Sequence, residues 1–139
     1  MASEPFEVFA ARAKDALPGH LGIENVEVTG QRVRLALAVR PAVMAPNGFL
    51  HAGAVVSLAD TACGYGCRLA LPAGAEGFTT IELKSNHLGT ARDGRIEAVA
   101  TPLHAGRTTQ VWDASVTHVE TGRLIAQFRC TQLVLYPKA

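Results

Sequence analysis

Asp60 is the residue of this sequence best placed to do chemistry, because it is a carboxylate in an otherwise apolar stretch. From Pro41 to Ala75 the only formal charges are Asp60 and Arg68. Burying an ionised carboxylate costs free energy unless the group is paired, hydrogen-bonded or needed for function. Three interpretations are therefore open: Asp60 is a nucleophile or general base, it caps a helix segment beginning at Thr61, or it pairs with Arg68.

A second group of interest begins with His51, which precedes Asp60 by nine residues in the order His51, Ala52, Gly53. If a helix starts there, the N–H groups of Ala52 and Gly53 have no partner within it and carry the positive end of its dipole. Such donors can stabilise a negative carbonyl oxygen. Alternatively, Gly53 serves only a tight turn or close packing. We expect His51 to orient the loop rather than act as a general base, and no second histidine stands at a metal-ligand spacing.

The composition is that of one globular domain spanning residues 1–139. The chain is 48% hydrophobic and 18% charged, and 13 basic against 12 acidic residues leave a net charge of +1. Without a basic block, we expect neither a nucleic-acid nor a membrane partner. The apolar stretch is long enough to suggest a membrane span, but charges and glycines interrupt it. A buried helix of a soluble protein is therefore the favoured interpretation.

The cysteines favour a reducing compartment. Cys63, Cys67 and Cys130 are odd in number, and the first two form a C-x₃-C pair without a second pair. This pattern fits neither a structural zinc site nor a disulfide framework, so we expect reduced thiols that fill small spaces in the core. The N-terminus lacks the basic and apolar segments of a signal peptide, and a cytoplasmic location is expected.

Hydrophobic periodicity predicts an α+β domain with one long central helix. A short first helix is expected over about residues 4–17, capped by Ser3 and ended by the pair Pro18-Gly19. The long helix is expected from Ala52 to Leu71 and should be enclosed by other structure. Short turns between the strands favour antiparallel pairing, giving a sheet of five or six strands wrapped around the helix. Strand patterns cover residues 23–28, 33–39, 78–88, 95–103, 112–117 and 124–131.

This order of elements, over about residues 20–135, resembles the hotdog fold. The closest likeness is to acyl-CoA thioesterases of the phenylacetate-degradation and 4-hydroxybenzoyl-CoA thioesterase type. The segment Gly48–Gly53 is similar to the G-x-x-H-G-G turn of that family, with Ala52 in place of a glycine. Asp60 stands at the family's nine-residue distance from the histidine, and the tail Thr121–Gln127 resembles its final hairpin.

The resemblance implies hydrolysis of an acyl- or aryl-CoA thioester, with no cofactor beyond the CoA of the substrate. The thiolate leaving group, with a conjugate acid of pKa roughly 8.5 by analogy with cysteine, leaves readily. The enzyme must therefore supply an attacker and a donor for the carbonyl oxygen. Asp60 would attack the thioester carbon or deprotonate a water, and the Ala52 turn would bind the oxygen. Because hotdog proteins join two sheets side by side, Asp60 would face the Ala52 turn of a partner in a homodimer or homotetramer.

The resemblance also implies secondary site residues. Thr79 matches a strand position where relatives often place Ser or Thr near the attacking water. The family often has Asn or Gln six residues before the histidine; this chain has Ala45 there, and its nearest amide is Asn47. Each candidate has a structural alternative as an ordinary strand, turn or core residue. The candidates for the acyl pocket are Phe49, Leu50, Tyr65 and Phe78, and those for the nucleotide phosphates are Lys84, His87, Arg92 and Arg107.

Two other functions remain open at this stage. A hotdog hydratase or dehydratase acting on acyl thioesters would change the enoyl absorbance rather than release a thiol. A non-catalytic acyl-CoA-binding regulatory module would bind CoA esters without turnover. Asp60 argues against the second, because a binder of an anionic ligand gains nothing from a buried carboxylate.

Overall fold

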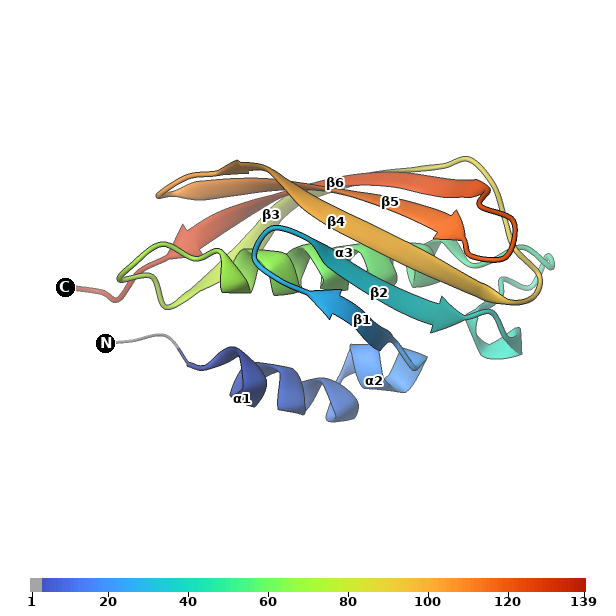
Figure 1. The fold of residues 1–139 in the computed structure, drawn as a ribbon, viewed down its shortest axis with the longest axis horizontal. Helices are drawn as coiled ribbons and strands as arrows, with labels where there is room; N and C mark the ends of the chain where they lie inside the picture. Colours follow the sequence, from blue (N-terminus) through green and yellow to red (C-terminus); the bar gives the residue numbers. More distant parts are fainter. Residues whose placement is uncertain (1–3) are drawn as a thin grey trace.

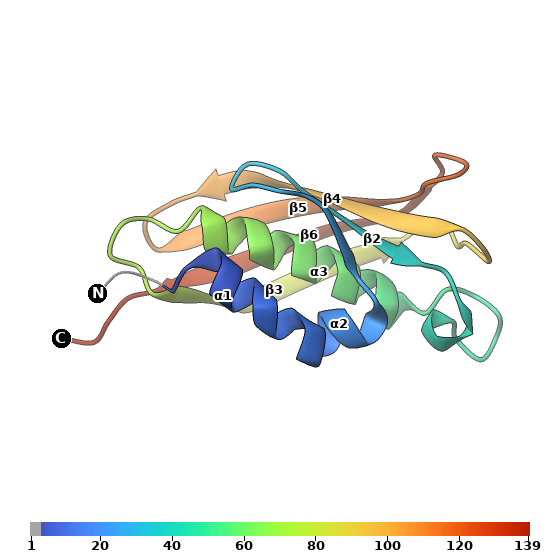
Figure 2. The ribbon, with the colours of Figure 1, turned by 60° about the horizontal axis from the view of Figure 1, so that its bottom comes forward.

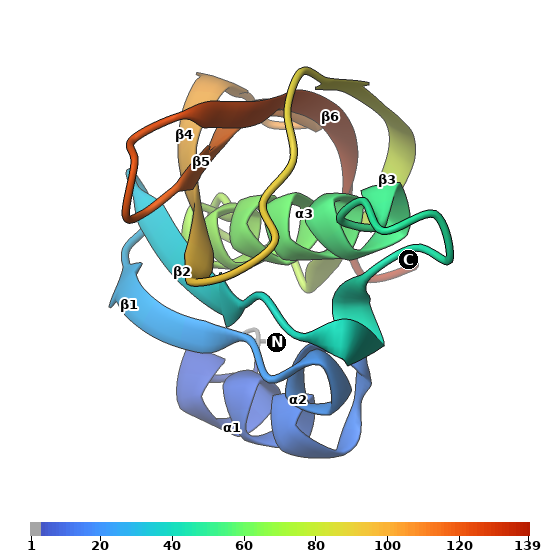
Figure 3. The ribbon, with the colours of Figure 1, turned by 90° about the vertical axis from the view of Figure 1, so that its right-hand side faces the viewer.

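A six-stranded antiparallel sheet curves around one long helix, α3 (Ala52–Leu69), in the structure, a computed structural model that describes residues 4–139. Figure 3, which views the molecule from one end, shows the sheet arching over the helix. This confirms the predicted hotdog architecture. The strands, in their order across the sheet, are β1 (Glu24–Val28), β2 (Val33–Ala38), β4 (Arg95–Ala105), β5 (Thr109–His118), β6 (Leu124–Leu135) and β3 (Gly77–His87).

The N-terminal segment lies on the side of α3 away from the main part of the sheet (Figure 1 and Figure 2). Its helices pack Phe6 and Phe9 against the hydrophobic core. The segment therefore covers a face of α3 that the sheet leaves open. It consists of α1 (Phe6–Ala11), the 3₁₀ turn η1 (Arg12–Asp15) and α2 (Leu17–Leu21).

The expectation of one continuous helix ended by Pro18 is wrong. The chain becomes extended at Ala16, with φ −119° and ψ −173°, and a new helix begins at Leu17. Proline is tolerated in a first helical turn because its missing N–H would have no partner there. Pro18 thus starts α2, which ends at Gly22 with a left-handed φ of 75°. The predicted cap, Ser3, lies outside the described residues.

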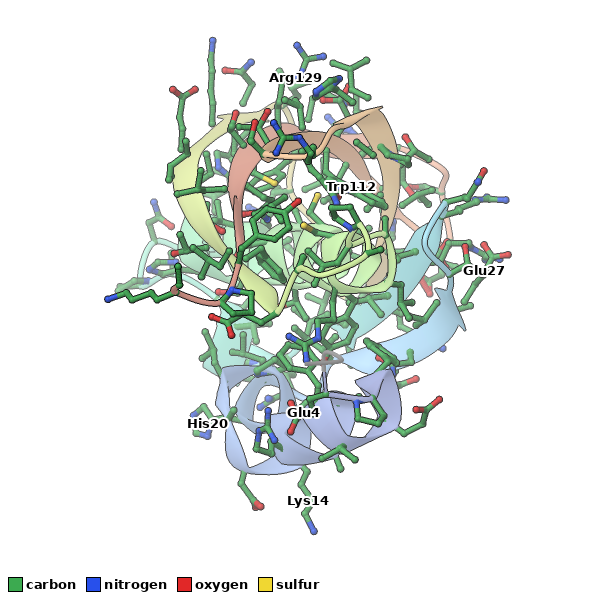
Figure 4. The ribbon with its side chains drawn as sticks, turned by 90° about the vertical axis from the view of Figure 1, so that its left-hand side faces the viewer. Glu4, Lys14, His20, Glu27, Trp112 and Arg129 are labelled. Atoms are coloured by element: carbon green, nitrogen blue, oxygen red, sulfur yellow. The ribbon has the colours of Figure 1, made fainter. Side chains whose placement is uncertain are left out.

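α3 is enclosed as its apolar sequence predicts, and its closest approach to the sheet is at Gly66. A methyl group at this position would overlap the ring of Trp112 on β5, which is fully buried. The Trp112 Nε1–H donates to Gln110 Oε1 at 2.7 Å, so the buried indole is satisfied. Figure 4 shows Trp112 directed into the core and Arg129 on the outer face of the sheet.

The three cysteines are buried free thiols, which confirms that they are small packing residues. Among residues 4–139, no helix is long and apolar enough to cross a membrane.

β3 forms one end of the sheet, so one of its edges has no partner strand within the described chain. The exposed fractions of Ile81 and Leu83 on this strand are 58% and 44%. A long apolar edge is a template for pairing with another chain, and soluble proteins rarely leave one uncovered.

Candidate active site

Asp60 lies in the middle of α3 with its side chain half-buried. Its Oδ1 is buried and has no hydrogen-bond partner among the described residues. Burial raises the pKa of this carboxyl above its ordinary value of 3.8, because the charged form loses its hydration. Neither structural alternative for Asp60 holds. A residue in mid-helix is not a cap, and Arg68 Nη2 instead lies 3.6 Å from Oε2 of Glu4.

Asp60 borders a cavity of about 190 Å³ between α3, the β3–β6 part of the sheet and the N-terminal segment. Tyr65 and Phe78, both predicted to line the acyl pocket, lie in its wall. The carboxylate therefore shares a cavity with these two aromatic side chains and a third, Phe9. The full lining is Phe9, Pro18, Asp60, Thr61, Gly64, Tyr65, Phe78, Thr80 and Gln132.

The threonine beside Asp60 is Thr80, not Thr79. Side chains alternate along a strand, and Phe78 and Thr80 both face the cavity, so Thr79 points to the opposite face of the sheet. The placement of Thr79 near Asp60 is therefore wrong by one residue, which on a strand reverses the face. The Thr80 hydroxyl donates to Oε1 of the fully buried Gln132 at 2.6 Å.

The start of α3 presents one free backbone donor. His51 is the N-cap, and its Nδ1 accepts the N–H of Gly53 at 2.8 Å. The N–H of Gly53 is therefore already hydrogen-bonded. The Nδ1 of His51 accepts that bond and is not free to act as a base, which favours the orienting role of His51. Gly53 also needs its small size, because an added methyl would crowd the imidazole. Among the described residues, the Ala52 N–H has no acceptor within hydrogen-bond distance.

Asp60 and the Ala52 N–H do not meet within one protomer. Eight residues separate them on the same helix, which at 1.5 Å per residue places them about 12 Å apart along its axis. His51 and Gly53 border a different cavity, of about 300 Å³, whose lining shares no residue with that of the Asp60 cavity. One chain therefore holds two candidate half-sites, the unpaired carboxylate oxygen of Asp60 and the free N–H of Ala52, on one helix.

Comparison with known proteins identifies a family. The model of the thioesterase superfamily matches residues 47–125, a span that contains both half-sites. The chain belongs to the thioesterase superfamily. It is 37% identical over 122 residues to a Bacillus subtilis protein named as an esterase, ComA2, covering 88% of this chain and 96% of the relative. It is 31% identical over 132 residues to the 1,4-dihydroxy-2-naphthoyl-CoA hydrolase of Escherichia coli, covering 93% of each.

The solved structures agree with this assignment. The crystal structure of a thioesterase from Haemophilus influenzae superposes with a TM-score of 0.85 at 29% identity, and the match covers 97% of this chain and 93% of that chain. The protein is thus a thioester-hydrolysing enzyme, which confirms the enzyme class predicted from the sequence.

The loop before α3 of this thioesterase places its predicted residues outside the Asp60 cavity. The Asn47 Oδ1 accepts the N–H of Phe49 at 3.2 Å, so this amide closes the loop on itself. The ring of Phe49 is 48% exposed and has the Arg92 guanidinium 5.5 Å from its centre. Leu50 belongs to the core, and its N–H donates to Thr90 Oγ1 at 2.9 Å. Contacts of these residues with substrate remain predictions.

The predicted phosphate ligands do not form one cluster within a protomer. Lys84 and His87 lie towards the end of β3, where His87 pairs with Ala126. Arg107 lies in the β4–β5 turn, close to Val134, whose N–H donates to the backbone of Thr108. The eight residues of β6 between these points span about 26 Å.

Several cavity residues escaped prediction from the sequence. Thr80 and Gln132 could have been predicted from the alternation of side chains along their strands. Thr80 alternates with Phe78, and Gln132 is a polar residue between Cys130 and Val134 on the buried face of β6. Phe9 and Pro18 could not have been predicted in this way, because the site they line forms only when the N-terminal segment folds back over α3.

Proposed function

We propose that this thioesterase hydrolyses an acyl- or aryl-CoA thioester to the free acid and CoA, at a site shared by two subunits. The proposal rests on one observation: an unpaired carboxylate oxygen of Asp60 in a cavity, with an unpaired Ala52 N–H on the same helix. The first suits an attacker and the second an oxyanion donor, the two requirements of thioester hydrolysis.

In the reaction, ionised Asp60 takes a proton from water as the water attacks the thioester carbon, or attacks that carbon itself to form an anhydride that water then cleaves. In both routes the carbonyl oxygen becomes negative and accepts the Ala52 N–H, at the positive end of α3. Collapse of the tetrahedral species breaks the carbon–sulfur bond and releases the CoA thiolate. No step requires a metal or a cofactor beyond the CoA of the substrate.

A second subunit completes the site in this proposal. Pairing of two β3 edges into one continuous sheet would cover the exposed Ile81 and Leu83. It would also place two copies of α3 side by side, so that Asp60 of one chain faces the Ala52 turn of its partner. The enzyme is accordingly a homodimer, or a homotetramer built from two such dimers, and we place it in the cytoplasm, without membrane or nucleic-acid partners.

The acyl group is compact, and aromatic acyl groups fit this description. A cavity of about 150 Å³ accommodates benzene, whereas the space beside Asp60 measures about 190 Å³ and has Tyr65 and Phe78 in its wall. A relative is named for an aryl-CoA substrate, 1,4-dihydroxy-2-naphthoyl-CoA. These observations support an arylacetyl- or aroyl-CoA substrate of the phenylacetate-degradation or 4-hydroxybenzoyl-CoA type.

The test is a set of CoA esters assayed with the wild type and with Asp60→Asn, following free thiol with a disulfide dye. We expect the wild type to release CoA from at least one aromatic ester, and the variant to lose about 100-fold or more in kcat/KM. An equally active variant would remove Asp60 from the mechanism. A change in enoyl absorbance without thiol release would indicate a hydratase, and tight binding without turnover would indicate a regulatory module.

A further inference from the structure

Phe9 lines both the Asp60 cavity and a second, apolar cavity under the N-terminal segment. The second cavity measures about 280 Å³ and is lined by Phe9, Arg12, Ala13, Ala16, Pro18 and Tyr65. Three of these residues, Phe9, Pro18 and Tyr65, also line the cavity of Asp60. The two spaces therefore meet at a partition that these three side chains form.

Pro18 and Tyr65 are fixed parts of this partition. Pro18 lies in the first turn of α2, and Tyr65 is 6% exposed on the buried face of α3. Phe9 comes from α1, a helix of one and a half turns that has no buried residue of its own. Phe9 is thus the member of the partition whose position depends on how α1 is held.

Arg68 holds Phe9 in place. Its guanidinium carbon lies 4.9 Å from the centre of the Phe9 ring, and the ring meets Tyr65 edge-on at 6.1 Å and 80°. Arg68 is only 10% exposed and donates to the carbonyls of Glu4, at 3.1 Å, and Glu76, at 3.3 Å. Glu4 lies where α1 meets the body of the molecule (Figure 4). The ring is therefore clamped between a cation and an aromatic edge.

We propose that Phe9 determines substrate specificity, as the wall that stops the acyl group at the end of the Asp60 cavity and excludes longer chains from the apolar cavity behind it. This inference rests on the proposed function, since it presumes that an acyl-CoA binds beside Asp60. With the ring in place, the acyl group has about 190 Å³, enough for a short chain or one ring. Without it, the apolar cavity of about 280 Å³ joins this space.

The direction and size of the effect follow from apolar burial. Each methylene that enters an apolar pocket changes kcat/KM by about tenfold when the pocket accepts or rejects it. Phe9→Ala removes the wall, so octanoyl- and dodecanoyl-CoA gain at least about tenfold in kcat/KM relative to butyryl-CoA. Phe9→Trp enlarges the wall and shifts the preference towards butyryl-CoA.

The experiment measures kcat/KM for butyryl-, octanoyl-, dodecanoyl- and phenylacetyl-CoA with wild type, Phe9→Ala, Phe9→Trp and a control, Phe6→Ala. Phe6 lies on the same helix and contacts Tyr65 with ring centres 5.5 Å apart, but it lines neither cavity. Its truncation removes a ring that lines neither cavity, while Arg68 and Tyr65 still hold Phe9, so the chain-length profile stays that of the wild type. Binding of S-octyl-CoA, a thioether that resists hydrolysis, tightens by a similar factor in Phe9→Ala and stays unchanged in Phe6→Ala.

An unchanged profile in Phe9→Ala overturns the inference, and so does an equal shift in Phe6→Ala, since loosening of α1 would then explain both. If Phe9→Ala fails to fold, Phe9→Leu, which opens the partition partly, takes its place, and its chain-length profile is compared with that of Phe9→Trp. A wild type that hydrolyses none of the esters refutes the proposed function itself. The two failures are therefore distinguishable.

Discussion

The raised pKa of Asp60 predicts how activity depends on pH, because burial raises this pKa above 3.8. In the proposed mechanism the ionised form reacts, so kcat/KM should fall as the pH drops through this raised pKa. The acid limb of the pH profile is therefore expected to have its midpoint above 3.8. A midpoint at or below that value would mean that the carboxylate is stabilised by a partner in the assembled site.

The same pKa shift has a consequence for stability. A carboxyl whose pKa is higher in the folded than in the unfolded chain favours folding below the unfolded pKa, and this contribution is lost as pH rises through the folded pKa. Asp60→Asn does not titrate. Its free energy of unfolding relative to wild type should therefore rise between about pH 4 and neutral pH. Urea unfolding at several pH values measures this difference, and a constant difference contradicts the buried-carboxylate account.

Thr80 and Thr79 offer a matched pair that tests which threonine faces the site. Thr80→Val removes the donor to the buried Gln132 Oε1 and should cost about 1–3 kcal/mol of stability, together with a loss of kcat. Thr79→Val changes an exposed side chain on the other face and should stay within about 0.5 kcal/mol of wild type. Thermal unfolding and steady-state kinetics measure both. The reverse order would place Thr79 in the site after all.

At the scale of elements, the packing of α3 against the sheet predicts opposite effects at two glycines. Gly66→Ala drives a methyl into the Trp112 ring and should destabilise the protein by about 1–3 kcal/mol. Gly64→Ala places its methyl in ordinary contact, 3.4 Å from Phe78 Cζ, and gains helix propensity of up to about 1 kcal/mol. Calorimetry of the two variants should give Tm values on opposite sides of wild type. Equal changes would contradict the close approach at Gly66.

The elements also show what the sequence could and could not predict. The apolar length of α3 and the period-2 strands predicted the helix-in-sheet architecture, since both patterns report burial directly. The break at Ala16 escaped prediction because Pro18 fits a helix start as well as a helix end. The error at Thr79 arose because this residue was predicted from its resemblance to a strand position of the family, and on a strand a shift of one residue reverses the face.

At the scale of the whole molecule, the candidate site could be predicted only as two halves. The spacing of His51 and Asp60 predicted an acid and a donor turn, and the structure places Asp60 and Ala52 on α3. The cavity beside Asp60, under the N-terminal segment, depends on contacts of residues far apart in sequence, such as Arg68 with Glu4 and Thr80 with Gln132. Periodicity carries no information about such contacts.

The two halves on one helix, about 12 Å apart, imply that a catalytic site takes Asp60 from one subunit and the Ala52 N–H from the other. Ala52→Pro deletes that N–H alone. Proline suits the first helical position, and the preceding His51, with φ −67° and ψ 128°, already has the backbone that a following proline requires. Ala52→Gly, which keeps the N–H, is the matched control.

Mixing the two inactive variants, Asp60→Asn and Ala52→Pro, after unfolding and refolding them together, tests this claim most directly. In a symmetric dimer, half of the molecules are hybrids, and each hybrid contains one site with both groups intact. We predict recovery of about a quarter of the wild-type thioesterase activity from two inactive proteins. If each chain carries a complete site of its own, the mixture stays inactive, and that result would contradict the shared site.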